Sequence, residues 1–333
     1  MHLRQNAATR EWVLFAPERA RRPEDYHAIQ GTPTHERPTH VATCPFCPGG
    51  EDNTPGETLR FLDDRGAWVV RAFPNRYPAI VPEGTDQRIG DRFHRHVSAY
   101  GHHEVVAESP LHNQTLALMG TAEIELVLRA WQERVRALWT LTRTDHVVLF
   151  KNHGPLGGTS LEHPHSQLVS LPVAPVQVRH RTDAALRYFD DYGHCVYCKM
   201  LEVERADQAR LVSVGEQFSA FVPYAAFSPY SVWIVPHQHR CCFSHSTPEE
   251  LQDLAVVLRD LLRRFYYGLH DPSYNLVLRL PSREFRDVAF YHYYFALVPR
   301  LGKAAGFEMG TGMFINTSLP ELDAAFLRGL PEI

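Results

Sequence analysis

This 333-residue chain repeats one pattern of cysteines and histidines in its two halves. The pair Cys44 and Cys47 recurs 151 residues later as Cys195 and Cys198. In each half, short apolar runs follow the cysteine pair, and then come a histidine, a segment with helical periodicity, another apolar run and a second histidine. Landmarks that agree in order and nearly in spacing predict an internal duplication of one structural unit.

Apolar periodicity predicts similar secondary structure in both halves. Helices are predicted at 122–142 and 248–268, with Thr121 and Thr247 as their N-caps. Strands are predicted at 11–16, 67–73, 78–82, 103–107, 146–150 and 168–172 in the first half, and near 218–222, 231–235, 275–280 and 289–298 in the second. Each half is therefore predicted to have strands on both sides of one long helix in the chain order.

The cysteines and histidines predict two tetrahedral metal sites. Zinc prefers four nitrogen or sulfur ligands, and a CxxC turn lets two sulfurs reach one ion. The predicted ligands are Cys44, Cys47, His112 and His163 in site 1, and Cys195, Cys198, His239 and His292 in site 2. Other histidines compete as ligands, namely His102, His103, His153, His237 and His245. With four protein ligands, one or two ions per chain, zinc or iron, would hold loops in place and would not activate water.

Other roles for the cysteines stay open. A redox pair is the alternative for each CxxC, although neither lies at the strand-to-helix turn of a thioredoxin-like unit. The adjacent Cys241 and Cys242 are interpreted as small buried residues, unless one of them replaces His239 as a ligand.

Charge and hydropathy limit the class of partner. The chain has 34 basic and 38 acidic residues, a formal charge of −4 and no long basic run. This balance argues against nucleic acid or an anionic membrane as the main partner. No apolar stretch approaches the roughly 18 residues that a membrane span needs, and the N-terminus lacks the apolar segment of a signal peptide. We therefore expect a cytoplasmic protein.

The sequence HPHSQ at 163–167 follows a glycine-bearing loop and precedes a predicted strand. A neutral imidazole can attack phosphorus and form a phosphoramidate, which divides one displacement into two steps. Alternation along an extended segment places His163 and His165 on the same side, so one can serve a metal while the other serves the substrate. Gln167, again two residues further on, can donate to a phosphate oxygen. The alternative is a strand whose polar residues face a satisfied cavity.

A family resemblance covers nearly the whole chain, and it is carried by APERARRP, CPFCPGGEDNTP, RAFPNRYPAI, ESPLHNQT, HPHSQ and GFEMGTG. The sequence resembles the galactose-1-phosphate uridylyltransferase branch of the histidine-triad superfamily. The resemblance implies an α+β fold of two tandem histidine-triad-like halves, each a mostly antiparallel sheet with flanking helices. It also implies a catalytic half at 1–180, a non-catalytic half at 181–333 and a homodimer.

The resemblance implies roles for individual residues as well. His165 is implied to be the uridylylated nucleophile and Gln167 its phosphate-binding partner. The residues implied to bind the nucleotide and its phosphates are Arg19, Arg22, Phe73, Asn75, Asn152 and Ser160. Arginine offers a planar fork for phosphate oxygens, and an aromatic ring can stack on a base. For the two arginines, a solvated charged loop is the alternative interpretation.

Tyr294 in the second half occupies the place of His165, which predicts one chemical centre per chain. The chain departs from the best-known family members at two places. Ser166 stands where those members usually have glycine. The tail around GFEMGTG lacks a clear match to the glutamine that contacts hexose phosphate, and is more similar to the related ADP-glucose phosphorylases. The two Cys-Cys-His-His sites resemble that subgroup too.

The expected activity is a ping-pong transfer of UMP in galactose metabolism. His165 attacks the α-phosphorus of UDP-glucose, or of a related sugar nucleotide, and releases glucose 1-phosphate. Galactose 1-phosphate then takes the uridylyl group. One alternative is an ADP-glucose or dinucleoside polyphosphate phosphorylase, with inorganic phosphate as acceptor. Another is a zinc-stabilised nucleotide-binding protein without transfer activity.

Overall fold

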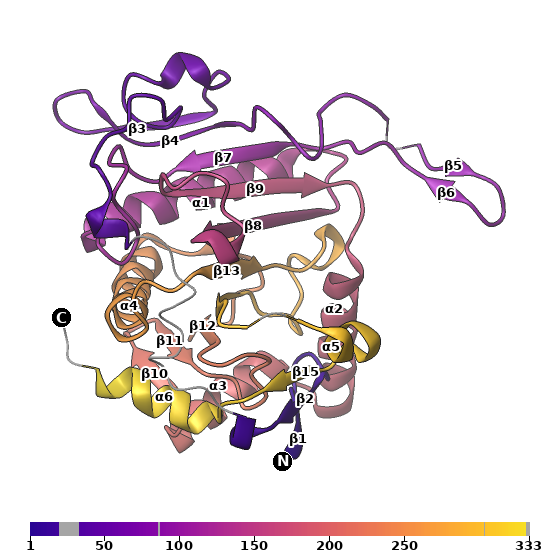
Figure 1. The fold of residues 1–333 in the computed structure, drawn as a ribbon. Helices are drawn as coiled ribbons and strands as arrows, with labels where there is room; N and C mark the ends of the chain where they lie inside the picture. Colours follow the sequence, from indigo (N-terminus) through magenta and orange to yellow (C-terminus); the bar gives the residue numbers. More distant parts are fainter. Residues whose placement is uncertain (20–32, 86, 303, 331–333) are drawn as a thin grey trace.

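One ten-stranded sheet forms the centre of the molecule and runs through both halves of the chain (Figure 1). The computed structural model describes residues 1–19, 33–85, 87–302 and 304–330. The strand order is β10-β11-β12-β14-β13-β8-β9-β7-β4-β3. The strands are β3 (Leu59–Leu62), β4 (Trp68–Pro74), β7 (His103–Ala107), β8 (His146–His153), β9 (His165–Leu171), β10 (Leu211–Val214), β11 (Phe218–Phe221), β12 (Val232–Pro236), β13 (Tyr274–Arg279) and β14 (Tyr294–Pro299).

The topology repeats the sequence duplication. Each half contributes three strands, one long helix and two further strands, in the same chain order. The order of strands in the sheet is mirrored about its middle, where β8 pairs with β13. All neighbouring pairs in this sheet are antiparallel. The fold is therefore α+β with mostly antiparallel pairing, as the sequence predicted.

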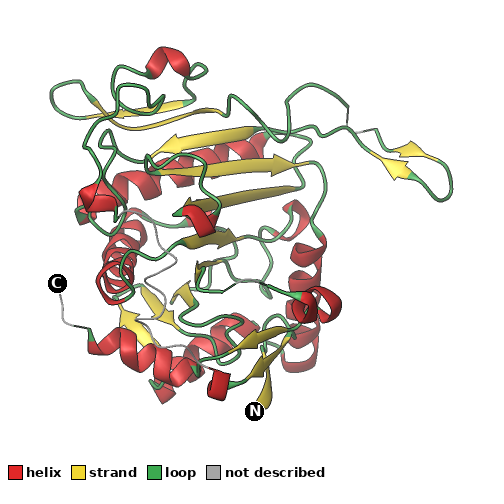
Figure 2. Ribbon diagram, viewed as in Figure 1, coloured by secondary structure: helices red, strands yellow, loops and turns green. Residues whose placement is uncertain are grey.

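Two long helices, α1 (Thr121–Thr140) and α4 (Pro248–Gly268), cover one face of the sheet and contact each other (Figure 2). Their apolar faces and the inward residues of the strands form the largest hydrophobic core, which spans both halves. The remaining helices are α2 (Val176–Tyr192), α3 (Val196–Asp207), α5 (Gly306–Thr311) and α6 (Pro320–Gly329). No helix in the described ranges is long and apolar enough to cross a membrane.

In the part of the chain that the structure describes, two small sheets lie outside the main one. β1 (His2–Gln5), β2 (Trp12–Phe15) and β15 (Phe314–Asn316) form a three-stranded sheet, in which β15 runs parallel to β2. The hairpin of β5 (Ile89–Gly90) and β6 (Arg95–His96) projects from the body of the molecule (Figure 1). The tail of the chain thus packs beside its first strands.

Both long helices are close to their predicted bounds. Thr247 caps α4, since its side chain accepts a hydrogen bond from the Glu250 amide (3.2 Å). The predicted cap Thr121 is instead the first helical residue, because Gly120 takes the cap position and its amide donates to the Glu123 carboxylate. The predicted strand at 78–82 is wrong, since only Val81 forms an isolated bridge. The strand predicted at 289–298 begins at Tyr294. Helices α2, α3, α5 and α6 were not predicted.

Alternation along β9 separates two kinds of side chain. Leu168 belongs to the core beneath the helices, and Ser166 accepts a 2.6 Å hydrogen bond from the buried indole N–H of Trp131 on α1. His165 and Gln167 project from the opposite face of the sheet, because successive side chains on a strand alternate. One face of β9 therefore anchors the sheet, and the other is available for chemistry.

Removing the Ser166 hydroxyl tests this anchor. Ser166→Ala is expected to lower the free energy of unfolding by about 1–3 kcal/mol, because it leaves a buried indole N–H without an acceptor. Chemical denaturation measures the change. The same substitution in a Trp131→Phe background should cost clearly less, since no indole N–H remains; equal losses in both backgrounds would contradict the assigned bond.

Candidate active site

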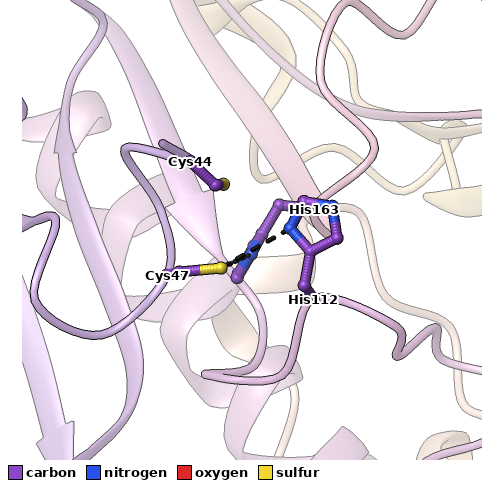
Figure 3. Close-up of side chains that lie close together, drawn as sticks. All are labelled: Cys44, Cys47, His112 and His163. Atoms are coloured by element: carbon purple, nitrogen blue, oxygen red, sulfur yellow. Dashed lines mark hydrogen bonds between the residues drawn. The ribbon is translucent and has the colours of Figure 1, made fainter. Parts of the chain in front are cut away.

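The four predicted ligands of site 1 lie together at one end of β9 (Figure 3). The ligand atoms of Cys44, Cys47, His112 and His163 are all within 4.8 Å of one another, and all four residues are buried. The Cys47 sulfur lies 3.5 Å from Nδ1 of each histidine. The chain thus brings two sulfurs and two imidazoles, from segments far apart in the sequence, to one point.

The turn that carries the two cysteines is held by a buried arginine. Arg71 on β4 donates to the Pro45 carbonyl (3.1 Å) and forms an ion pair with Glu57 (3.2 Å). The turn also closes tightly on Gly50, where a Cβ would lie 2.7 Å from the Cys44 carbonyl oxygen. The cysteines are therefore positioned by β4 and by close backbone packing.

His163 is oriented for ligation by its second ring nitrogen. Its Nε2–H donates to the Ser109 carbonyl (2.8 Å), which leaves the lone pair of Nδ1 directed at the cysteines. Burial lowers the pKa of His163 to about 3. A neutral imidazole with a free Nδ1 is the form that binds a metal ion.

The predicted ligands of site 2 also come together. The ligand atoms of Cys195, Cys198, His239 and His292 lie within 4.8 Å of one another, and the Cys198 sulfur is 3.3 Å from Nδ1 of His239. A hydrogen bond with Cys198 lowers the pKa of Cys195. Unlike its counterpart, this CxxC pair begins a helix, because Cys195 is the N-cap of α3.

Both clusters fit a metal ion. Each supplies two sulfurs and two imidazole nitrogens, the donor set of structural tetrahedral sites. The competing histidines named above belong to neither cluster. Cys241 is also elsewhere, since its thiol donates to the Phe285 carbonyl (2.9 Å).

His165 opens β9 and is buried beside site 1. Its Nδ1–H donates to the carbonyl oxygen of His163 (2.8 Å), so the lone pair belongs to Nε2. Burial lowers the pKa of His165, which keeps the ring neutral near pH 7. A neutral imidazole in a fixed tautomer has the properties of a nucleophile.

Phe46 is a site residue that the sequence analysis missed. Its ring lies 5.5 Å from the ring of His165 and 6.0 Å from that of His163, at steep angles. Phe73 packs against Phe46 at 5.3 Å and is only 1% exposed. Phe73 therefore supports the wall of the site beside Phe46.

His103 is the second residue whose place was not predicted. Its Nδ1 accepts from the Ala79 amide (3.1 Å), so its Nε2–H donates to Oε1 of Gln167 (2.8 Å). Asn75 lies at the same ring nitrogen, 3.2 Å away. Since the Gln167 carbonyl is occupied in this way, its NH₂ group is left to donate elsewhere. The feature of the sequence that could have indicated this role is a polar residue, His103, at the first position of β7, the strand that pairs with β9.

The glycine loop after β8 contacts the second half of the sheet. Asn275 on β13 donates to Asn152 and to the Gly157 carbonyl, each at 2.8 Å. Gly157 lies so close to β13 that a Cβ would meet the Tyr274 carbonyl oxygen at 2.7 Å. Ser160 is exposed further along this loop.

The two arginines predicted to bind phosphate are not found beside His165 in the described residues. Arg19 is exposed and lines a cavity of about 910 Å³ together with Leu156, Arg300, Phe307 and Glu308. Neither His165 nor Gln167 lines that cavity, although Leu156 belongs to the loop after β8. Arg22 lies outside the described residues.

Tyr294 begins β14 just as His165 begins β9. It is buried and packs on Trp233 with ring centroids 4.2 Å apart. A buried phenol in an aromatic cluster offers no nucleophile like that of His165, which is consistent with one chemical centre per chain.

The chain is similar to known proteins over nearly its full length. The N-terminal domain model of galactose-1-phosphate uridyl transferase matches residues 1–175, and the C-terminal domain model matches residues 181–331. An ADP-glucose phosphorylase of Arabidopsis thaliana is 31% identical over 98% of this chain and 92% of its own. A galactose-1-phosphate uridylyltransferase of Thermotoga maritima is 29% identical over 98% of both chains.

A solved structure extends the similarity to three dimensions. The crystal structure of an Arabidopsis thaliana ADP-glucose phosphorylase with bound ADP-glucose has a TM-score of 0.84 and covers 99% of each chain at 29% identity. With both domain models matched in order along nearly the full length, the chain belongs to the galactose-1-phosphate uridyl transferase family.

Proposed function

We propose that this chain is a nucleotidyltransferase that acts on a nucleotide sugar through a covalent nucleotidyl-His165 intermediate. The observation that carries the proposal is the fixed tautomer of His165, whose Nδ1–H is bound to the His163 carbonyl at 2.8 Å. The ring therefore has one available lone pair, on Nε2, on the face of β9 that also presents Gln167. This is the arrangement that attack on phosphorus requires.

The first step forms one bond and breaks another. The Nε2 lone pair attacks the α-phosphorus, and the bond from that phosphorus to the oxygen of the β-phosphate breaks. The sugar 1-phosphate leaves with that electron pair. The Gln167 amide N–H donates to a non-bridging oxygen of the transferred group, where charge must be stabilised.

The second step reverses the first with another acceptor. An oxygen of the acceptor phosphate attacks the nucleotidyl group, the P–Nε2 bond breaks, and His165 returns to its neutral form. The Lys151 ammonium, paired with Glu108 at 2.6 Å, lies 3.3 Å from the backbone carbonyl of His165 and fixes the start of β9. The nucleophile can then act repeatedly without reorganisation of its strand.

Two donors are consistent with family membership. ADP-glucose, with inorganic phosphate as acceptor, is favoured by the 31% identity to an ADP-glucose phosphorylase and by the TM-score of 0.84 to a structure that holds ADP-glucose. UDP-glucose, with galactose 1-phosphate as acceptor, is supported by the family models and by the 29% identity to a uridylyltransferase. We give ADP-glucose precedence over the UDP-glucose expected from the sequence.

Zinc is the ion that we assign to both clusters. Two thiolates and two imidazoles leave no open coordination position, so the ion supplies rigidity and no Lewis-acid chemistry. Site 1 would hold the turn of Cys44 and Cys47 against His163, whose carbonyl orients His165. The proposed homodimer rests on the family resemblance alone.

Intact-mass spectrometry tests the intermediate. The protein is mixed with ADP-glucose and, separately, with UDP-glucose; an added adenylyl mass that phosphate removes is the expected result. His165→Ala should form no adduct with either donor. A uridylyl adduct cleared by galactose 1-phosphate would replace the donor assignment. No adduct from either donor in the metal-loaded wild type would favour a nucleotide-binding protein without transfer activity.

Metal analysis tests the two clusters. Elemental analysis of the purified protein is expected to find two zinc ions per chain, and one after Cys47→Ser or Cys198→Ser, because each variant loses a thiolate ligand. Cys241→Ser is the matched control and should retain two ions. If Cys241→Ser lost an ion while Cys198→Ser kept both, the ligand assignment of site 2 would be wrong.

A substitution at His103 tests its role as a positioning residue. His103→Ala is expected to lower kcat roughly tenfold with little change in KM, since Gln167 loses the hydrogen bond that orients its amide. His103→Gln can restore an N–H at that place and should recover part of the loss. The neighbouring His102→Ala is the control, and a similar loss there would indicate a general structural effect.

A further inference from the structure

A second cavity lies beside the start of α2. It is on the face of the main sheet from which His165 and Gln167 project. Its volume is about 200 Å³, and its walls come from β8, β13, the first two turns of α2 and the segment before β14. The polar residues among them are His146, Gln177, Arg181, Arg279 and Tyr291. None of the proposed catalytic or metal-binding residues lines this cavity.

Two guanidinium groups face this cavity without a carboxylate. Within the described ranges, neither Arg181 nor Arg279 pairs with an acidic side chain, and the buried Nε of Arg181 has no hydrogen-bond partner. The carboxylate of Glu11, on the exposed turn between β1 and β2, has an electrostatic influence on both arginines. Both arginine side chains are partly buried. Two like charges held near one another at a partly buried place without a counter-ion repel, so an anion is favoured between them.

The start of α2 adds to the positive field of the cavity, whereas His146 is neutral there and adds no charge. α2 has 17 residues, and no side chain caps its first turn, so the free amides at Val176 and Gln177 point out of the helix start. The Nδ1–H of His146 donates to the Pro281 carbonyl (3.1 Å), which turns Nε2 away from that bond. Burial lowers the pKa of His146 to about 4, and both arginines act in the same direction.

The duplication explains why a cavity occurs here. Arg279 is paired with Tyr294 in the β13–β14 ladder, and Tyr294 occupies the position of His165. The β8–β9 ladder pairs Phe150 with Gln167, so two residues further along the same register Asn152 comes opposite His165. Arg279 therefore stands where Asn152 stands in the first half. The second half has lost the nucleophile at this place and has gained a positive charge.

We propose that this cavity is a second anion site, which binds inorganic phosphate or the phosphate group of a small phosphomonoester. Arg181 and Arg279 supply charge-assisted hydrogen bonds, and the first amides of α2 complete the site. The volume suits one tetrahedral anion and is below the usual range for pockets that hold larger ligands. Binding neutralises the two guanidiniums and joins α2 to β13.

Phosphate titrations of the full-length protein test the site. In chloride buffer, inorganic phosphate should raise the melting temperature of the wild type, because it binds the folded state. Arg181→Gln and Arg279→Gln should each weaken phosphate binding roughly tenfold or more in calorimetry. Without phosphate they should melt no lower than the wild type, since each removes one of two repelling charges. Arg95→Gln in the exposed β5–β6 hairpin is the matched control and should bind phosphate normally.

Two further experiments distinguish phosphate binding in this cavity from phosphate binding at the proposed active site. Phosphate binding that persists in Gln167→Ala and is lost in Arg181→Gln belongs to the cavity. Crystals of the wild type soaked in selenate should show an anomalous peak between Arg181 and Arg279, a readout that does not require a folded variant. Glucose 1-phosphate in place of phosphate distinguishes a phosphomonoester from the free ion. No peak in the cavity, or unchanged phosphate affinity in both arginine variants, would overturn the proposal.

Discussion

The pairing of β8 with β13 is the interaction on which the rest of the structure depends. Its antiparallel ladder runs from Tyr274 opposite His153 to Leu278 opposite Leu149. Without this ladder, each half would be a separate five-stranded sheet, and β8 and β13 would be exposed edge strands. With it, the cores beneath α1 and α4 become one hydrophobic cluster. The glycine loop after β8 is placed by the same pairing, because Asn275 on β13 binds it.

The connection between metal site and nucleophile is made through the main chain. His163 is a ligand candidate through Nδ1, and its carbonyl oxygen accepts the Nδ1–H of His165. The same residue thus contributes its ring to the cluster and its backbone to the tautomer of the proposed nucleophile. A displacement of the cysteine turn would move His163 and change the direction of the Nε2 lone pair. Through this coupling, an ion held by the four candidate ligands would influence the proposed nucleophile although the site has no open coordination position.

The two halves show how one scaffold supports different chemistry. Both have a Cys-Cys-His-His cluster and the same strand order. The first half places His165 at the start of β9, whereas the second places the buried Tyr294 at the start of β14. The cysteine turns also differ, because the second continues as α3. The two halves therefore differ in the side chains at this position, while the backbone pairing is the same in both.

The sequence alone determined the repeat, the two long helices, the eight candidate ligands and the HPHSQ segment. These follow from local periodicity and from spacing, which reflect 3.6 residues per helical turn and two per strand repeat. It did not determine the roles of Phe46 and His103, or the inward burial of Phe73. Those depend on which strands become neighbours: β7 lies beside β9, and β4 beside β7. Pairing between strands that are far apart in the sequence cannot be predicted from any one segment. Only the tertiary structure therefore decided which side chains support His165 and Gln167.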